Sequence, residues 1–355
     1  MSPVTDAPVT TNRRDDLGSA GGVRGLLWLT WRQHRWALIG TLVLAAVLVG
    51  WMAYLSTELT DLYHQCHNMR CPKNSPQGQR LSARPYGLFR QASYMERLVQ
   101  YMPLLIGMFI GVPVLSREHE QRTLLLAWSQ DISPARWLWT KLSLLGLFVV
   151  AVTAAVAGVS DHLEHVATNV GPEDLFRYEP FLTTGMLPVA ISICWFAVGV
   201  ALGAAIRRTL PAVFGVVAGF IGLMLFVQLR YPTLMKPLSY YRQLYQPNDG
   251  VLGDNALRID RGITPGLDRG SNLFDSSGHE LDLAELHRIC PDFGISPDTD
   301  FACFANNHLQ TYVVYQPGSR IPDFHLIVGA GYLGLAAVAL AAVWWIVRRT
   351  NLSAG

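Results

Sequence analysis

The chain has 355 residues, of which 50% are hydrophobic and only 15% are charged, and its formal net charge is +2. Because soluble globular domains carry about 25% charged residues, this composition predicts that much of the chain lies outside water. A net charge so close to zero gives no support for nucleic acid as a partner.

The N-terminal 35 residues divide into a polar tail and an amphipathic segment. Residues 1–20 are rich in Ser, Thr, Asp and Pro, which predicts a disordered cytoplasmic tail. Residues 21–35 place Val23, Leu27 and Trp31 on one helical face, a pattern typical of a helix lying in the membrane interface. A plain extension of the first membrane span is the alternative.

Six segments are long enough to cross a bilayer, whose hydrocarbon core of about 30 Å needs roughly 20 apolar residues in a helix. None of them contains Asp, Glu, Lys or Arg, and charged residues border each one. The six segments are 36–57, 98–116, 142–160, 181–206, 210–229 and 324–347. The sequence therefore predicts an all-α integral membrane protein with six transmembrane helices, five of them within 36–229.

The distribution of arginine predicts the orientation of these spans. Arg207-Arg208 and Arg348-Arg349 directly follow spans four and six. The loop 161–179 instead holds one Arg and five acidic residues. Since basic residues gather on the cytoplasmic side of a membrane, both termini, including the tail 348–355, are expected in the cytoplasm. The chain is thus predicted to be a multi-pass protein of the cell membrane.

The segment 117–141 is the only long loop expected on the cytoplasmic side, and we call it the elbow. Its first part, up to Trp128, lacks Gly and Pro and predicts a helix in which Glu118 and Arg122 are spaced i,i+4. Ser133 and Pro134 then resemble a helix cap followed by proline at the first helical position. The charged start and apolar end of this helix are typical of a docking surface; a solvated loop is the alternative.

The segments on the opposite, extracellular side hold an even number of cysteines. Four cysteines lie there, which predicts a disulfide framework with three possible connectivities: Cys66, Cys71, Cys290 and Cys303. The local pairs 66–71 and 290–303 are our first choice. A metal site formed by Cys66, Cys71 and the neighbouring histidines is the alternative. Cys194, inside span four, is expected to be a packing residue.

The longest extracellular segment, 230–323, is expected to have mixed structure with a helix at 281–289. It contains few apolar residues, so we do not expect it to fold independently. Within the spans, three glycine pairs have the spacing that lets helices approach closely: Gly107/Gly111, Gly199/Gly203 and Gly215/Gly219. Proline is expected to kink spans two and four, at Pro103, Pro113 and Pro188.

Several kinds of chemistry lack their motifs in this chain. None of its three lysines follows a glycine, so the phosphate-binding loop of nucleotide hydrolases cannot form. No span carries the carboxylate, Lys or Arg that ion-coupled carriers usually place at mid-membrane. The sequence therefore indicates neither an enzyme nor an ion-driven carrier, and no metal or other cofactor is expected in the chain.

Taken together, these features resemble the membrane subunit of exporter-type (type-2) ABC transporters, and of the actinobacterial permeases among them. The similarity covers the order of the spans, the elbow and the large segment before span six. The local sequences that carry it are WLTWRQHR at 28–35, GVPVLSREHEQRTLLLAWSQ at 111–130, YQPGSR at 315–320 and WWIVRR at 344–349.

This resemblance implies that some subunits form the transport pathway and others bind ATP. Two permease subunits, expected as a homodimer, would form the pathway for an exported amphipathic molecule or peptide. Two separate ATPase subunits would bind ATP and Mg. The elbow would dock on the ATPase through seven candidate residues: Glu118, Glu120, Arg122, Thr123, Leu125, Trp128 and Gln130.

Two other classes of protein remain alternatives at this point. A membrane sensor or accessory protein would bind a ligand through 230–323 and a signalling partner through the elbow. An intramembrane enzyme would need paired catalytic acids or a His/Asp/Glu cluster, and none of the spans contains one.

The predicted topology can be tested by labelling single cysteines in intact cells. In a cysteine-free variant, cysteines at Ser19, Ser129 and Ser353 should resist a membrane-impermeant thiol reagent, because they face the cytoplasm. One placed at Ser271 should be labelled. Labelling at Ser129 together with protection at Ser271 would reverse the orientation.

Overall fold

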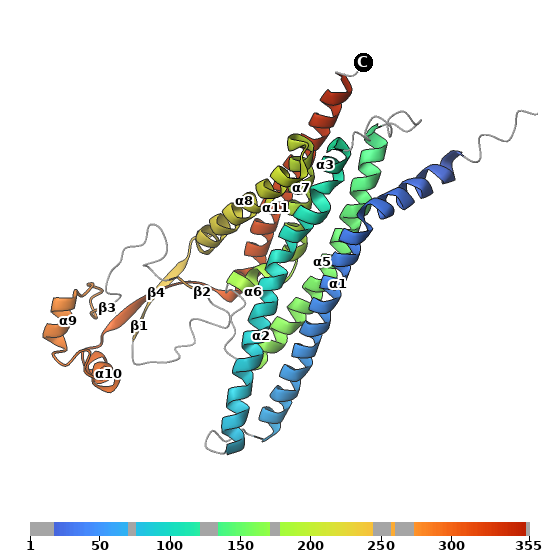
Figure 1. Ribbon diagram of the computed structural model, residues 1–355. Coiled ribbons are helices and arrows are strands. Elements are labelled where there is room, and N and C mark those ends of the chain that lie inside the picture. Colours follow the sequence, from blue (N-terminus) through green and yellow to red (C-terminus); the bar gives the residue numbers. More distant parts are fainter. Residues whose placement is uncertain are drawn as a thin grey trace, which may run out of the picture.

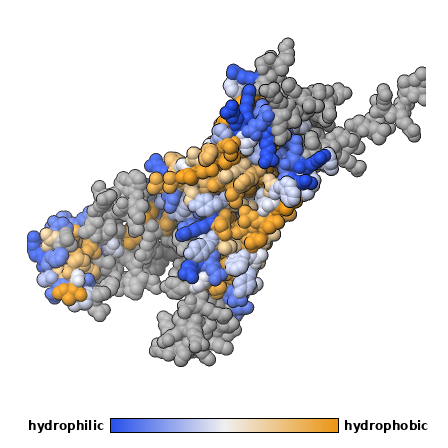
Figure 2. All heavy atoms as spheres, in the orientation of Figure 1, coloured by the Kyte–Doolittle hydropathy of each residue, from blue (hydrophilic) through white to orange (hydrophobic). Residues whose placement is uncertain are grey.

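The computed structural model describes residues 18–69, 76–120, 134–170, 178–243, 257–259 and 273–352. Within these ranges, six helices are long and apolar enough to cross a membrane, which confirms the predicted all-α membrane fold. Figure 1 shows them as one bundle with a small unit of strands and helices projecting from it. Figure 2 shows hydrophobic residues over the middle of this bundle, as expected of a surface that faces lipid.

Nine helical elements build the bundle. They are α1 (Gly18–Met69), α2 (Pro76–Ile106), the π-helix η1 (Gly107–Gly111), α3 (Pro113–Glu120), α5 (Pro134–Val170), α6 (Tyr178–Thr183), α7 (Leu187–Ile206), α8 (Thr209–Arg230) and α11 (Ile321–Leu352). We call the end of the bundle where α3 and α11 finish the elbow end. The opposite end, where α8 finishes and α11 begins, is the sheet end.

The segment 21–35 is helical, as predicted, but it is not a separate element. It belongs to α1, which continues from Gly18 through the first span. Figure 1 shows the first turns of α1 leaving the bundle at an angle. Trp28, Trp31 and Trp36 are exposed there, as interfacial tryptophans should be. The interfacial position itself stays a prediction.

Helix α7 stands at the centre of the bundle and contacts α2, η1, α3, α5, α8 and α11. Two of the predicted glycine pairs create its closest contact. A Cβ at Gly111 would lie 2.7 Å from the carbonyl oxygen of Phe196, and one at Gly203 would lie 2.5 Å from that of Val112. Since real Cβ atoms do not approach so closely, only glycine permits this crossing of α7 with η1 and α3.

The third pair, Gly215 and Gly219, brings α8 against α7. A Cβ at either position would lie 3.3 Å from a side chain of α7, Leu202 and Trp195 respectively.

Of the three prolines that were expected to kink their spans, two flank an irregular segment and the third does not bend its helix. The π-helix lies between Pro103 and Pro113 in the second span, whereas Pro188 does not bend α7 but starts it.

The fourth span differs from the prediction, which made 181–206 one segment. The structure divides it into α6 and α7, with a turn at 184–186 between them. Gly185 has a φ of +61° in this turn, a conformation that favours glycine. Phe181 packs its ring 4.8 Å from that of His325. The chain therefore enters the sheet end of the bundle and turns before it crosses.

The projecting unit contains a four-stranded antiparallel sheet and two helices. The strands are β1 (Leu238–Gln243), β2 (Leu257–Arg258), β3 (Leu273–Phe274) and β4 (Gln310–Gln316), with β4 pairing with each of the other three. The helices are α9 (Leu283–Ile289), which matches the helix predicted at 281–289, and α10 (Pro297–Asn306).

This unit has a small core of its own, with Leu281, Leu286 and Phe304 buried. A disulfide joins Cys290, at the end of α9, to Cys303 in α10, which confirms one predicted pair. The side chain of Cys66 and the whole of Cys71 lie outside the described residues, so their pairing stays a prediction. Cys194 is buried and unbridged, as expected of a packing residue.

The glycine crossing predicts a sharp difference between two substitutions. Gly199→Ala would place a Cβ against the carbonyl oxygen of Gly107, and such overpacking typically costs about 1–3 kcal/mol. Its melting temperature in detergent should fall. Gly158→Ala in α5, where a Cβ would meet nothing within 4 Å, should melt at or above the parent temperature. Equal melting of both variants would contradict the close crossing.

Candidate functional site

The last turn of α3 begins the elbow, and it is bonded to the start of α8. Glu120 accepts a hydrogen bond at Oε1 from the backbone N–H of Thr209, 2.7 Å away, and one at Oε2 from the Thr209 hydroxyl, 3.0 Å away. The hydroxyl of Ser116 lies 2.9 Å from that of Thr209. The first N–H groups of a helix have no partner within it, so Glu120 caps α8 from a different helix.

The chain between α7 and α8 is a two-residue turn. Arg207 has a φ of 59° and donates its N–H to the carbonyl of Gly203 across 3.1 Å, which ends α7. Arg208 is extended and makes no side-chain cap for α8. Because this turn is so short, a movement of the elbow that pulls on Thr209 also acts on the end of α7.

A buried ion pair joins the two ends of the elbow, which lie in α3 and α5, and a further hydrogen bond connects it to α1. Glu118 Oε1 accepts from Lys141 Nζ at 2.7 Å, and both side chains are less than a tenth exposed. The same Nζ donates to Gln33 Oε1 at 3.0 Å and lies 5.1 Å from the centre of the Trp137 ring. Desolvating two charges is costly, so this pair holds a fixed arrangement of α1, α3 and α5.

The structure locates two of the seven predicted docking residues. Glu118 is buried inside the bundle, so its side chain does not lie on the surface that the prediction assigned to it. Glu120 is exposed and bonded to α8. The other five lie at 121–133, outside the described residues: Arg122, Thr123, Leu125, Trp128 and Gln130. Their contact with an ATPase stays a prediction, and so does the pairing of Glu118 with Arg122.

Sequence reasoning missed the partners of the two glutamates, which are Lys141 for Glu118 and Thr209 for Glu120. It also missed the bond from Lys141 to Gln33. One signal was present, since Lys141 directly borders span three. Nothing in the sequence shows that it faces Glu118, because 23 positions separate the two residues. Four charged side chains just outside the apolar stretches are buried by helix packing: Glu96, Glu118, Lys141 and Glu164.

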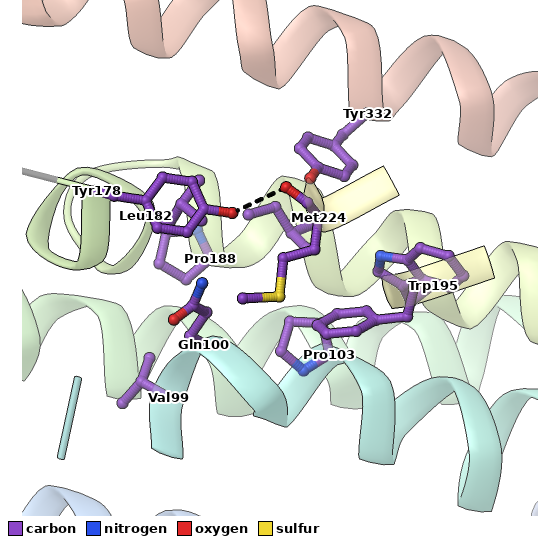
Figure 3. Close-up of a pocket in the computed structure, with 11 residues that line it drawn as sticks. Val99, Gln100, Pro103, Tyr178, Leu182, Pro188, Trp195, Met224 and Tyr332 are labelled. Atoms are coloured by element: carbon purple, nitrogen blue, oxygen red, sulfur yellow. Dashed lines mark hydrogen bonds between the residues drawn. The ribbon is translucent and has the colours of Figure 1, made fainter. Parts of the chain in front are cut away.

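A small cavity lies nearer the sheet end, between α2, α6, α7, α8 and α11 (Figure 3). Gln100, Tyr178 and Tyr332 give it polar edges, and Tyr178 donates to the carbonyl of Met224 across 3.1 Å. Its volume of about 20 Å³ has room for a single water molecule. Among the described residues, no group of three or more His, Cys, Asp or Glu side chains could hold a metal ion.

The buried ion pair predicts a non-additive pair of substitutions. Lys141→Met should destabilise the protein by about 3–5 kcal/mol, because it leaves the Glu118 carboxylate buried without its cation. Glu118→Met combined with Lys141→Met should recover most of that loss. Denaturant unfolding in detergent measures both, and a single variant as stable as the parent would contradict the pairing.

The bundle and the projecting unit match two different family models. Residues 42–231, more than half of the chain, match "ABC-2 membrane transporter related", and residues 233–321 match a domain of unknown function, DUF8319. No curated protein and no solved structure matches the chain. The first model covers more than half of the chain, and the structure shows six apolar helices in a bundle. The chain therefore belongs to the ABC-2 membrane transporter-related family and is a multi-pass membrane permease.

Proposed function

We propose that this permease works as a pair of identical subunits driven by two separate ATPase subunits, which bind the elbow on the cytoplasmic side. ATP and Mg bind to those partners. The pair of permeases exports an amphipathic small molecule or peptide. Family membership supports the role of the chain as a permease. The contacts of the elbow support the proposal that ATPase subunits drive it by binding there.

The hydrogen bonds of Glu120 carry the proposal. They tie the first turn of the elbow to α8, which at 17% is the least buried of the membrane helices that the structure describes. A helix with so little packing is easier to displace than α7, of which 61% is buried. When an ATPase moves the elbow, α8 is therefore the first helix to follow.

The ion pair between Glu118 and Lys141 is a second connection through which a movement of the elbow reaches the membrane helices. It fixes α3 to α5 and, through Gln33, to the first span. A displaced elbow thus moves α1 and α5 on one side and α8 on the other. This is the arrangement expected if nucleotide binding to an ATPase docked on the elbow switches the pathway between inward-facing and outward-facing access.

A substitution in the elbow separates coupling from folding. Leu125→Asp should abolish co-purification of the ATPase and the ATP hydrolysis that transport stimulates, because it puts a charge on the apolar part of the docking surface. Ser353→Asp, which adds the same charge to the C-terminal tail, should leave both unchanged. The Cys290–Cys303 disulfide serves as the folding control. Normal ATPase recovery with Leu125→Asp would rule out docking through this surface.

A further inference from the structure

An apolar space of about 230 Å³, which we call the crevice, opens at the sheet end between α8 and α11. Both helices pack on α7, and the crevice separates them where α8 finishes and α11 begins. It extends along α8 from Leu223 to Arg230 and along α11 from Ile327 to Leu335, which is roughly 10 Å and 12 Å at the rise of an α-helix. Both lengths fit within one leaflet, whose share of the hydrocarbon core is about 15 Å thick.

Each wall of the crevice is a single face of one helix. The residues that line it are spaced by three or four positions on α8 and on α11, as residues of one helical face are. Phe226 in the first wall is 60% exposed, and at Gly331 in the second a Cβ would meet nothing within 4 Å. The crevice is therefore open to the side, where a bilayer would present acyl chains to it.

The crevice lies on a different side of α8 from the stripe that a second copy of the chain would cover. With 3.6 residues per turn, Leu223, Val227 and Arg230 lie nearly opposite that stripe. A second copy that covers the stripe thus leaves the crevice facing lipid. The residues of the stripe are all at least half exposed: Leu210, Phe214, Ile221 and Leu225.

Hydrogen bonds fix the two walls to each other at the sheet end. Gln316, the last residue of β4, is wholly buried, and its Nε2 donates to the carbonyls of Pro232 at 3.1 Å and Met235 at 2.7 Å. Arg320 Nη1 donates to Gln316 Oε1 and to the carbonyl of Lys236, both at 2.9 Å. The segment that follows α8 is thereby joined to the segment that precedes α11.

The end of α8 is also held against α6. Tyr231, which lines the crevice, has its ring centre 5.6 Å from that of Tyr178 and 5.4 Å from that of Phe181. The Tyr178 hydroxyl donates to the carbonyl of Met224 in α8. Since these contacts fix the last turns of α8, the crevice keeps its width without a ligand, as binding sites for small molecules usually do.

Arg230 supplies positive charge at the mouth of the crevice. It is exposed and forms no ion pair with any residue that the structure describes. Asp323, one helical turn before Ile327, is also exposed and is not paired with it. Arg230 directly follows the apolar stretch of α8, at the level where the phosphates of a leaflet lie. Its guanidinium can bind a phosphate through two parallel hydrogen bonds.

We propose that the crevice binds one phospholipid of the leaflet at the sheet end, with its phosphate on Arg230 and an acyl chain between α8 and α11. The site goes beyond the proposed function, and the predicted topology makes that leaflet the extracellular one. The acyl chain fills the space between the two helices and so braces the sheet end of α8, while the elbow end of the same helix stays loosely packed.

Photolabelling of the full chain in lipid nanodiscs tests the site without ATP or a partner subunit. The probe is phosphatidylglycerol with a photoreactive diazirine on its acyl chain. Labels should appear within 223–230 of α8 and 327–335 of α11. Excess phosphatidylglycerol should compete with the probe, whereas diacylglycerol and inorganic phosphate should not. Equal labelling of Leu326 and Leu333, on the opposite face of α11, would mean that the probe only samples surrounding lipid and would overturn the proposal.

Two pairs of variants test the mouth and the walls of the crevice separately. Arg230→Gln should reduce labelling about tenfold, the effect of losing a hydrogen bond between charged groups. Arg90→Gln, an exposed arginine of α2, should not change it. Gly331→Phe should fill the crevice and abolish labelling. Gly334→Phe, on α11 outside the crevice and equally open at its Cβ, should label like the parent.

Melting in detergent tests whether the lipid braces α8. Added phosphatidylglycerol should raise the melting temperature of the parent and of Arg90→Gln more than that of Arg230→Gln. Equal behaviour of the two arginine variants in labelling and in melting would overturn the proposal.

The outcomes distinguish this inference from the proposed function. Labelling in the crevice without any association of an ATPase would reject the proposed function and leave the site standing. ATPase coupling and export without labelling in the crevice would reject the site alone. If a second copy of the chain occupies the crevice instead, the parent protein will not label and Gly331→Phe will dissociate the dimer, which also overturns the site.

Discussion

The backbone contact between α7 and the second span is the constraint on which the rest of the bundle depends. It exists because Gly111, Gly199 and Gly203 have no Cβ at points where one would clash with the backbone of the facing helix. It also fixes the height at which α3 ends relative to the end of α7, since both helices run from this crossing to the elbow end. Glu120 can reach Thr209 only because that height is set. The contact between Glu120 and Thr209 is therefore a consequence of glycine packing, about two and a half helical turns along the second span from Gly111.

Helices α7 and α8 differ in how tightly they pack against the rest of the bundle. α7 is apolar on all sides and buried among its neighbours, as expected of a central helix. α8 has only Ala212, Val216 and Phe220 buried among its residues, and its first turn is capped by another element. In the proposed mechanism, a force at the elbow meets a tightly packed helix and a loosely packed one joined by two residues. We therefore expect α8 to be the helix of this pair that moves.

The sequence predicts the features of this protein that depend on local composition. The absence of charge located the spans, glycine spacing located the helix crossing, and the cysteines of 290 and 303 were paired correctly. It failed where a contact is distant or a turn is apolar. The turn at 184–186 carries no charge, so hydropathy joins α6 to α7. The burial of Lys141 depends on Glu118 and Gln33, which come from two other helices.

The spaces in the bundle bear on how a cargo could cross it. Within the described residues, the small cavity in Figure 3 admits one water, whereas a groove of about 720 Å³ opens on the side of the bundle between α1 and α8. No charged side chain lies in the middle of any span, so a single copy has neither a wide path nor the ionisable groups of a carrier. In the proposed mechanism, a pathway between the outer faces of two copies would supply the width, and the ATPase partners would supply the energy that an ion-coupled carrier draws from its ionisable groups. The exposed apolar faces of α1 and α8 are surfaces that such a second copy would cover.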